Sequence, residues 1–131
     1  MRIEKTCYEL TQPVITSKAQ ISSREGWVVV MGEGELTGRG EILPLEGWSS
    51  VTIEEAYFQL VSYKHSEISF LELSAEVQSA INLAIWNLEA SKNDESLLDH
   101  LGGGLNCVKV NAFLDGSSQR NLRRGLESYR A

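Results

Sequence analysis

The segment GRGEILPLEGWSSVT, residues 38–52, has the pattern of a strand end, a compact turn and the cap of a helix. Glycines bracket a turn that presents Pro44, Leu45 and Trp48, so large apolar side chains stand where a loop usually meets solvent. Such a loop is tolerated when it covers something, either a ligand site or another domain. The alternative is that Leu45 and Trp48 fold back onto the domain's own small core.

The residues before this segment predict an antiparallel meander of three strands. Strands are expected at residues 2–10, 27–31 and 36–42. Gly32-Glu33-Gly34-Glu35 supplies the turn between the last two strands. Thr11-Gln12-Pro13 is expected to end the first strand, and residues 14–23 to form a loop long enough to suggest a function. Gly38 and Gly40 mark either a close approach of two backbones or a bulge.

The residues after the segment predict helices that cover one face of the sheet. Thr52-Ile53-Glu54-Glu55 fits a capping box. The apolar stripe of the first helix is expected at Ile53, Tyr57, Leu60, Val61 and Lys64. A second helix follows Ser74, and Glu76 in its first turn suits the helix dipole. Its stripe is Val77, Ile81, Ala84, Ile85 and Leu88, widened by Ala80 and Trp86. A short helix is expected at about Glu95 to Leu101.

A domain boundary is predicted at Gly102-Gly103-Gly104. This run follows a helix and opens a strand, so it indicates a linker and not a phosphate-binding loop. Residues 1–104 are therefore expected to form one α+β domain, and residues 105–131 one strand followed by one helix. A single β-α unit cannot close a sheet, so it packs on the first domain or the chain is a fragment. In a fragment, we expect the exposed strand at 106–114 to favour self-association.

Composition excludes several classes of partner. The net charge of -6 over 131 residues disfavours nucleic acid and anionic membranes, because neutralising phosphates needs a basic face. Cys7 and Cys107 lie far apart in strand-like runs, which predicts two buried thiols in a reducing, cytoplasmic protein. No segment is long and apolar enough to span a membrane, and the first residues do not have the pattern of a targeting signal.

The residue patterns predict no active site in this chain. His65 and His100 are not at metal-ligand spacing, and no Gly-x-Ser-x-Gly motif or paired serine and histidine indicates a nucleophile. Acidic residues near helix starts, such as Glu54 and Glu55, have structural explanations. From these patterns alone, the chain is an α+β domain without an assigned function.

Three stretches resemble a known family: Thr16-Ser17 through Trp27, Gly38 through Glu55, and Ala80 through Leu88. They are similar to the N-terminal capping domain of the enolase superfamily, in its o-succinylbenzoate synthase branch. Val108 to Ala112 resembles the first strand of the family's (β/α) barrel, and residues 117–131 resemble the first barrel helix. The chain departs from the family at several positions: Trp48 replaces the usual Phe, Asn87 the usual Asp, Asn82 a frequent acid, and Lys18-Ala19 a frequent Ser-Gly.

The resemblance implies that this chain supplies the loops that close over a substrate and set specificity. Ser17, Ile21, Leu45 and Trp48 would touch or shield a small-molecule substrate that the missing barrel binds. A complete barrel needs about 250 residues. In this family, barrel lysines act as acid and base, and barrel acids hold one Mg²⁺. The resemblance therefore implies no catalytic residue, metal ligand or cofactor in this chain, and Mg²⁺ in the full-length parent.

The family reaction is a magnesium-assisted dehydration in menaquinone or phylloquinone synthesis, so the parent would be a lyase and this chain inactive alone. Two alternatives stay open. The chain could instead be the lid of an N-acylamino-acid racemase or dipeptide epimerase. It could also be a free-standing binding domain without catalysis, in which case residues 105–131 should pack on the first domain.

Overall fold

The computed structural model describes residues 1–15 and 20–103 of the chain. Ser17, Cys107, and the strand and helix expected within residues 105–131 lie outside the described residues. The described part falls into two units. The first comprises Met1–Glu9 and Ser23–Gly104, and the second includes Leu10–Ser22.

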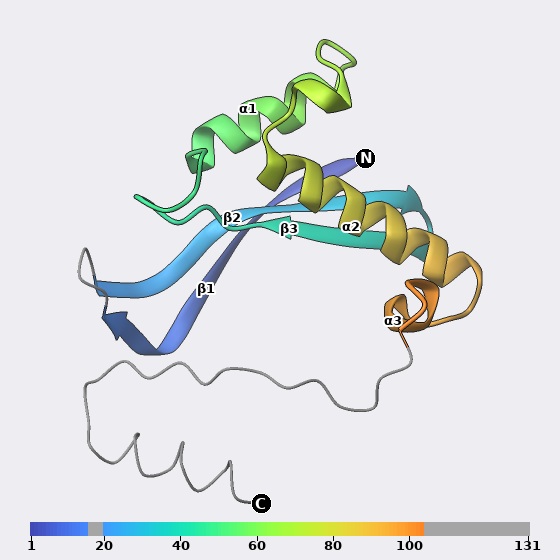
Figure 1. Ribbon diagram of the computed structural model, residues 1–131, viewed down its shortest axis with the longest axis horizontal. Coiled ribbons are helices and arrows are strands. Elements are labelled where there is room, and N and C mark those ends of the chain that lie inside the picture. Colours follow the sequence, from blue (N-terminus) through green and yellow to red (C-terminus); the bar gives the residue numbers. More distant parts are fainter. Residues whose placement is uncertain (16–19, 104–131) are drawn as a thin grey trace, which may run out of the picture. The chain divides into compact units, whose positions relative to one another are not determined.

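Among the described residues, the sheet has three antiparallel strands in the order β1-β2-β3, as Figure 1 shows. Their bounds are Arg2–Ile15 for β1, Gln20–Glu33 for β2 and Leu36–Ile42 for β3. The pairing of β2 with β3 runs without interruption from Trp27 opposite Ile42 to Glu33 opposite Leu36. The predicted meander is confirmed, and the unbroken register excludes a bulge at Gly38 or Gly40.

The first two strands are longer than predicted. Val14 and Ile15 continue β1, and β2 begins at Gln20, so the expected loop over residues 14–23 is wrong at both of its ends. Pro13 does not end β1, because β1 is an edge strand and a proline there can lack its N–H without breaking a ladder bond. The polar residues of this segment led to the prediction of a loop. An edge strand such as β1 needs few apolar residues, so its polar end was not recognised as a strand.

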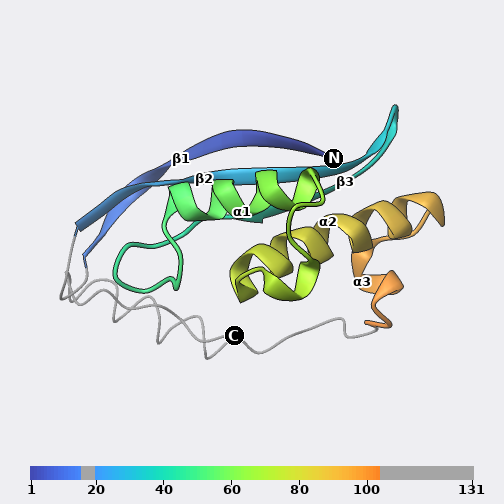
Figure 2. The same cartoon turned by 90° about the horizontal axis from the view of Figure 1, so that it is seen from above.

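In the part of the chain that the structure describes, three α-helices and one short 3₁₀ turn follow the sheet. The helices are α1 (Ile53–Lys64), α2 (Ala75–Lys92) and α3 (Leu97–His100), and the 3₁₀ turn is Phe70–Glu72. The capping box of α1 is confirmed: the Glu55 N–H donates to Thr52 Oγ1 over 3.1 Å, and the Thr52 N–H donates to Glu55 Oε2 over 2.8 Å. Figure 2 shows α1 and α2 on the same face of the sheet. No described helix combines the length and apolar character needed to cross a bilayer.

The core lies between the sheet and these two helices. The stripe predicted for α2 is confirmed at Val77, Ile81 and Ala84 with Ala80, whereas Trp86 is exposed. The stripe predicted for α1 is partly wrong. Leu60 is fully buried, but Tyr57 and Lys64 are exposed, and the buried face is centred on Ala56 and Leu60.

The close contact between β3 and α2 depends on glycine. A Cβ atom on Gly40 would lie 1.9 Å from the carbonyl oxygen of Ala80, and one on Gly38 would lie 1.9 Å from that of Ala84. Real Cβ atoms do not approach backbone so closely, so both positions require glycine. The prediction that these glycines mark a close approach of backbones is confirmed, and small residues on α2 complete the contact.

The sheet face opposite the helices is covered by polar side chains. Val28 and Val30 point to this face, because their partners Glu41 and Arg39 are out of phase with the buried Ile42. Both valines are nevertheless buried, at 7% and 1% exposure. Two interactions from β1 to β3 pass over β2: Arg39 Nη2 to Glu4 Oε2 at 3.0 Å, and Tyr8 OH to Glu41 Oε2 at 2.9 Å. These long side chains keep water from the central strand.

Cys7 is exposed, so its predicted burial is wrong. It lies on the edge strand β1, where Ile3 packs against the core. An edge strand has a neighbouring strand on one side only. Some of its side chains can therefore remain exposed to solvent without a packing partner. Alternation of side chains along the sequence does not distinguish such an edge position from a central one.

Candidate functional site

The connection between β3 and α1, residues 43–52, forms a compact loop that we call the lid loop. The backbone N–H groups of Trp48 and Ser49 both donate to the Leu45 carbonyl over 2.9 Å, and Ser49 Oγ accepts from the Leu45 N–H over 2.9 Å. Gly47 has a positive φ of 76°, which a side chain would disfavour. The turn predicted here therefore exists, and it is closed by its own hydrogen bonds.

The residues that the sequence predicted to contact substrate differ in their exposure and in the unit to which they belong. Leu45 is half-buried and Trp48 is 65% exposed, so the indole does not fold back fully onto the core. Ile21 is half-buried on β2 and belongs to the second unit. Ser17 lies outside the described residues. The structure thus joins Leu45 and Trp48 in one loop, and the role of all four residues stays a prediction.

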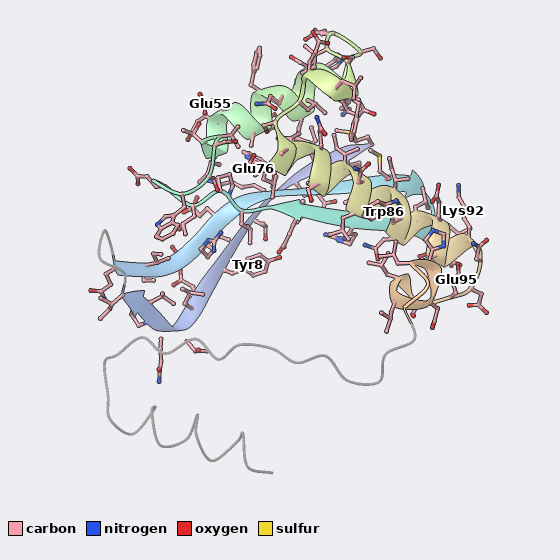
Figure 3. All side chains as sticks on the ribbon, viewed as in Figure 1. Tyr8, Glu55, Glu76, Trp86, Lys92 and Glu95 are labelled. Atoms are coloured by element: carbon pink, nitrogen blue, oxygen red, sulfur yellow. The ribbon has the colours of Figure 1, made fainter. Side chains whose placement is uncertain are left out.

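The lid loop is attached to the sheet at its beginning and to α2 near its end. Arg24 on β2 donates from Nη2 to the Leu43 carbonyl. Ser50 donates twice to Glu76 on α2: its N–H to Oε1 over 2.8 Å and its hydroxyl to Oε2 over 2.7 Å. Figure 3 marks Glu76 in the first turn of α2. The loop is therefore held from both sides by side chains distant in sequence.

The carboxylate of Glu76 is stabilised in its charged form. The hydrogen bond from the Ser50 N–H is the largest cause that lowers the pKa of Glu76 below its ordinary value, followed by the bond from the Ser50 hydroxyl. The backbone N–H of Glu76 itself contributes a smaller lowering, and slight burial opposes it. The acceptor of both Ser50 bonds is thus ionised at neutral pH.

Trp27 on β2 fixes the beginning of α1, directly after the lid loop. Its ring stacks on Tyr57 with centroids 4.4 Å apart and planes inclined by 29°, and its Nε1–H donates to the Ile53 carbonyl over 2.9 Å. Sequence reasoning used Trp27 as a strand former and Glu76 as a dipole partner. It missed both of these contacts, because no spacing rule links residues so far apart in the chain.

His100 joins α3 to the end of α2. Its Nδ1 lies 2.7 Å from Glu95 Oε1 and its Nε2 lies 3.4 Å from Glu89 Oε2. The hydrogen bond to Glu95 is the main reason that the pKa of His100 is raised above its ordinary value. We interpret this cluster as a structural contact between helices, far along the chain from the lid loop.

The described residues do not fit a magnesium site. Within residues 1–15 and 20–103, no group of three His, Cys, Asp or Glu side chains is arranged to hold a metal ion. Oxygen ligands from several carboxylates would be needed for such an ion.

A meander of three antiparallel strands, followed by helices packed on one face, is a fold that this chain shares with an enolase family member and with two other solved proteins. The chain belongs to the family described as "MenC, N-terminal domain", whose model matches residues 5–82. The matched range includes the lid loop, Trp27 and Glu76 and ends before His100. Comparison with curated proteins found no match.

Solved structures of three other proteins share this fold. A probable mandelate racemase from Alicyclobacillus acidocaldarius is 18% identical, with a TM-score of 0.69, over 96% of this chain and 40% of that one. An enolase family member from Agrobacterium tumefaciens with homology to dipeptide epimerases, solved with sodium and L-Ala-L-Glu, is 16% identical with a TM-score of 0.63, over 79% and 34%. An L-Ala-D/L-Glu epimerase is 23% identical with a TM-score of 0.56, over 79% and 33%.

These likenesses establish the fold and leave the reaction open. The chain spans between a third and two fifths of the length of the three solved proteins. At such identities, a shared fold does not identify a shared substrate.

Proposed function

We propose that this chain is the N-terminal capping portion of an o-succinylbenzoate synthase-like lyase, that it supplies substrate-specificity loops, and that it is inactive alone. The observation that supports this proposal is the match of the MenC N-terminal domain model over residues 5–82. In the chain that would complete it, a barrel would bind the small-molecule substrate and hold Mg²⁺. We expect the protein in the cytoplasm, without nucleic acid or membrane partners.

The lid loop has the properties that a specificity loop needs. Its turn is closed by hydrogen bonds to the Leu45 carbonyl, and it is tied to β2 through Arg24 and to α2 through Glu76. Trp48 projects from this turn with 65% of its surface exposed. A rigid loop with an exposed indole can exclude water and fit one shape of substrate, while a partner domain performs the proton transfers.

A second candidate is the lid of an N-acylamino-acid racemase or dipeptide epimerase. Two structural neighbours, one an epimerase and one with homology to dipeptide epimerases, favour it. Both reactions use the same capping fold, so the lid loop alone does not separate them. A third reading, a free-standing binding domain, depends on residues 105–131, as does the self-association expected through residues 106–114. Both lie outside the described residues.

The test is to sequence the encoding gene beyond codon 131 and to compare the complete product with the 131-residue polypeptide. Each is assayed with Mg²⁺ for formation of o-succinylbenzoate, racemisation of N-acylamino acids and epimerisation of dipeptides. We expect magnesium-dependent dehydration by the complete product and no turnover by the polypeptide. Turnover by the polypeptide would contradict the proposal. Inversion of amino-acid or dipeptide stereocentres without dehydration would favour the second candidate.

A further inference from the structure

Glu76 binds one residue of the lid loop, Ser50, through both of its carboxylate oxygens. Both of its carboxylate oxygens accept from Ser50, one from the backbone N–H over 2.8 Å and the other from the hydroxyl over 2.7 Å. A single hydrogen bond fixes a distance but allows rotation. Two bonds to the two oxygens of one carboxylate fix the orientation of Ser50 as well, and bonds to a charged acceptor are stronger than neutral ones.

Ser50 lies directly beside the turn of the lid loop, so its contact with Glu76 can hold that turn in position. It directly follows Ser49, whose N–H donates to the Leu45 carbonyl over 2.9 Å and whose Oγ accepts from the Leu45 N–H over 2.9 Å. The residues from Leu45 to Ser49 are therefore closed into one small unit. Fixing Ser50 fixes the end of that unit, and with it the position of Trp48.

The contact is more than an ordinary helix-terminus interaction. An acidic residue in the first turn of α2 stabilises the helix by its charge alone, wherever its oxygens point. Here the carboxylate is instead directed at another segment of the chain. The beginning of α2 is held by other residues: the Ser74 N–H donates to Gln59 Oε1 over 2.7 Å, and Gln78 Nε2 donates to the Leu73 carbonyl over 2.9 Å.

We propose that Glu76 is a positioning residue that holds the turn bearing Leu45 and Trp48 in one place relative to α2, by binding both donors of Ser50. Its purpose in substrate selection rests on the proposed function, but its mechanical role does not. Glu76 acts through Ser50, and the side chain that would meet the substrate is Trp48. Specificity at this loop would then depend on a helix residue distant from the loop in sequence.

The experiment measures backbone amide exchange in the 131-residue polypeptide and in its Glu76→Gln variant. We expect exchange at Trp48 and Ser49 to rise about tenfold or more, because a lost hydrogen bond to a charged group has an effect of that order. Exchange in β2 and β3 should stay within about twofold, since those strands are held by the core. An unchanged turn, or an equal rise throughout the sheet, would overturn the proposal.

Two further variants separate positioning from general stability. Glu72→Gln is the matched control: Glu72 Oε2 accepts from the Ser69 N–H over 2.7 Å, which is the same kind of bond at a site outside the lid loop. This variant should leave exchange at Trp48 unchanged. Ser50→Ala keeps the charge of Glu76 at α2 and removes the hydroxyl bond, so it should raise exchange in the turn even if Glu76→Gln does not fold. No change in Ser50→Ala would contradict the proposal.

These readouts are independent of catalysis. If exchange responds as expected but the complete gene product does not form o-succinylbenzoate, the positioning role stands and the proposed function fails. If the product is active but exchange does not respond, the proposed function stands and the positioning role fails.

Discussion

The indole of Trp27 stacks on the phenol ring of Tyr57 at a centroid distance of 4.4 Å and also donates to the Ile53 carbonyl over 2.9 Å. One side chain of β2 thus holds the first turns of α1. We expect Trp27→Phe to lower the free energy of unfolding by about 1 kcal/mol, because it keeps a ring but loses the hydrogen bond. Trp27→Ala should cost about 3 kcal/mol or more, as large aromatic truncations do.

Urea unfolding of these variants supplies the measurement, and Trp86→Phe is the control. Trp86 is 41% exposed on α2, so its replacement should change stability by less than about 0.5 kcal/mol. Equal losses of unfolding free energy in Trp27→Phe and Trp86→Phe would show that the contact of Trp27 with α1 does not stabilise the domain.

Gly40→Ala tests the close contact between β3 and α2. The added methyl would lie 1.9 Å from the Ala80 carbonyl oxygen, so strand and helix would have to separate. We expect a loss of about 3 kcal/mol, the upper end for overpacking. Gly34→Ala is the comparison, because nothing lies within 4 Å of its added methyl although its φ is 65°. Its backbone strain should cost about 1 kcal/mol. A smaller loss at Gly40 than at Gly34 would contradict the contact.

Asn87→Asp tests how α2 binds the outer edge of β3. Asn87 Nδ2 donates to the Arg39 carbonyl over 2.9 Å, and an ionised aspartate has no hydrogen to donate. Thermal unfolding at pH 7 should show a loss of about 1–3 kcal/mol. The deficit should shrink below about pH 4, where aspartic acid regains a proton. Asn82→Asp, earlier on the same helix, adds the same charge and should not reproduce this pH-dependent recovery.

The contact of His100 with Glu95 should make the attachment of α3 depend on pH. The raised pKa of His100 means that its contribution is complete below its ordinary value of 6.5 and lost as pH rises through the folded-state value. The pKa of Glu95 is lowered from 4.5, chiefly by the hydrogen bond from His100, so its contribution is complete above 4.5 and lost as pH falls through the folded-state value. This cluster should therefore stabilise α3 most between about pH 4.5 and 6.5.

A titration of the His100 ring by NMR checks the direction of its pKa, and amide exchange at residues 97–103 follows α3. Glu89 and Glu95 are the carboxylates that face the ring. His100→Gln keeps a polar side chain but cannot titrate, so protection of α3 in this variant should lose its dependence on pH above 6. An unchanged pH profile in His100→Gln would refute the assignment.

Trp48→Ala should separate substrate binding from stability. Because the indole is 65% exposed, we expect the free energy of unfolding to change by less than about 0.5 kcal/mol. In the complete gene product, KM should rise about tenfold, since an aromatic side chain that covers a substrate contributes on the order of 1.5–3 kcal/mol. Phe58→Ala, 70% exposed on α1, is the control and should leave KM unchanged. Equal effects of both substitutions on KM would argue against a role for the lid loop.

Local patterns in the sequence predicted much of this fold. The capping box of Thr52 and Glu55 needs residues three apart, and the β-branched run beside Trp27 needs consecutive ones, so both were found. Glycines 38 and 40 indicated a close approach, although the sequence did not name α2 as the partner. The end of β1 was missed, because an edge strand tolerates both polar residues and Pro13; the start of β2 was missed because its first residues, from Gln20 to Glu25, are mostly polar.

The candidate site was predicted less completely than the fold. The turn of the lid loop was found from apolar residues between glycines, whereas the residues left open whether Trp48 folds back onto the core. The bonds from Ser50 to Glu76 and from Trp27 to Ile53 each join residues that the fold brings together from distant parts of the chain. Spacing rules act over a few residues, so only the tertiary structure could reveal them.

The polar interactions above Val28 and Val30 determine the character of the outer face of the sheet. A β-sheet usually needs a second layer on each face that carries apolar residues, and in the described part of the chain the side chains of Glu4, Tyr8, Arg39 and Glu41 lie over the valines on this face. Their charged and hydroxyl groups hydrate readily, while their stems shield the valines beneath. Among the described residues, four polar side chains thus give this face of the sheet a hydrated surface above a buried apolar strand.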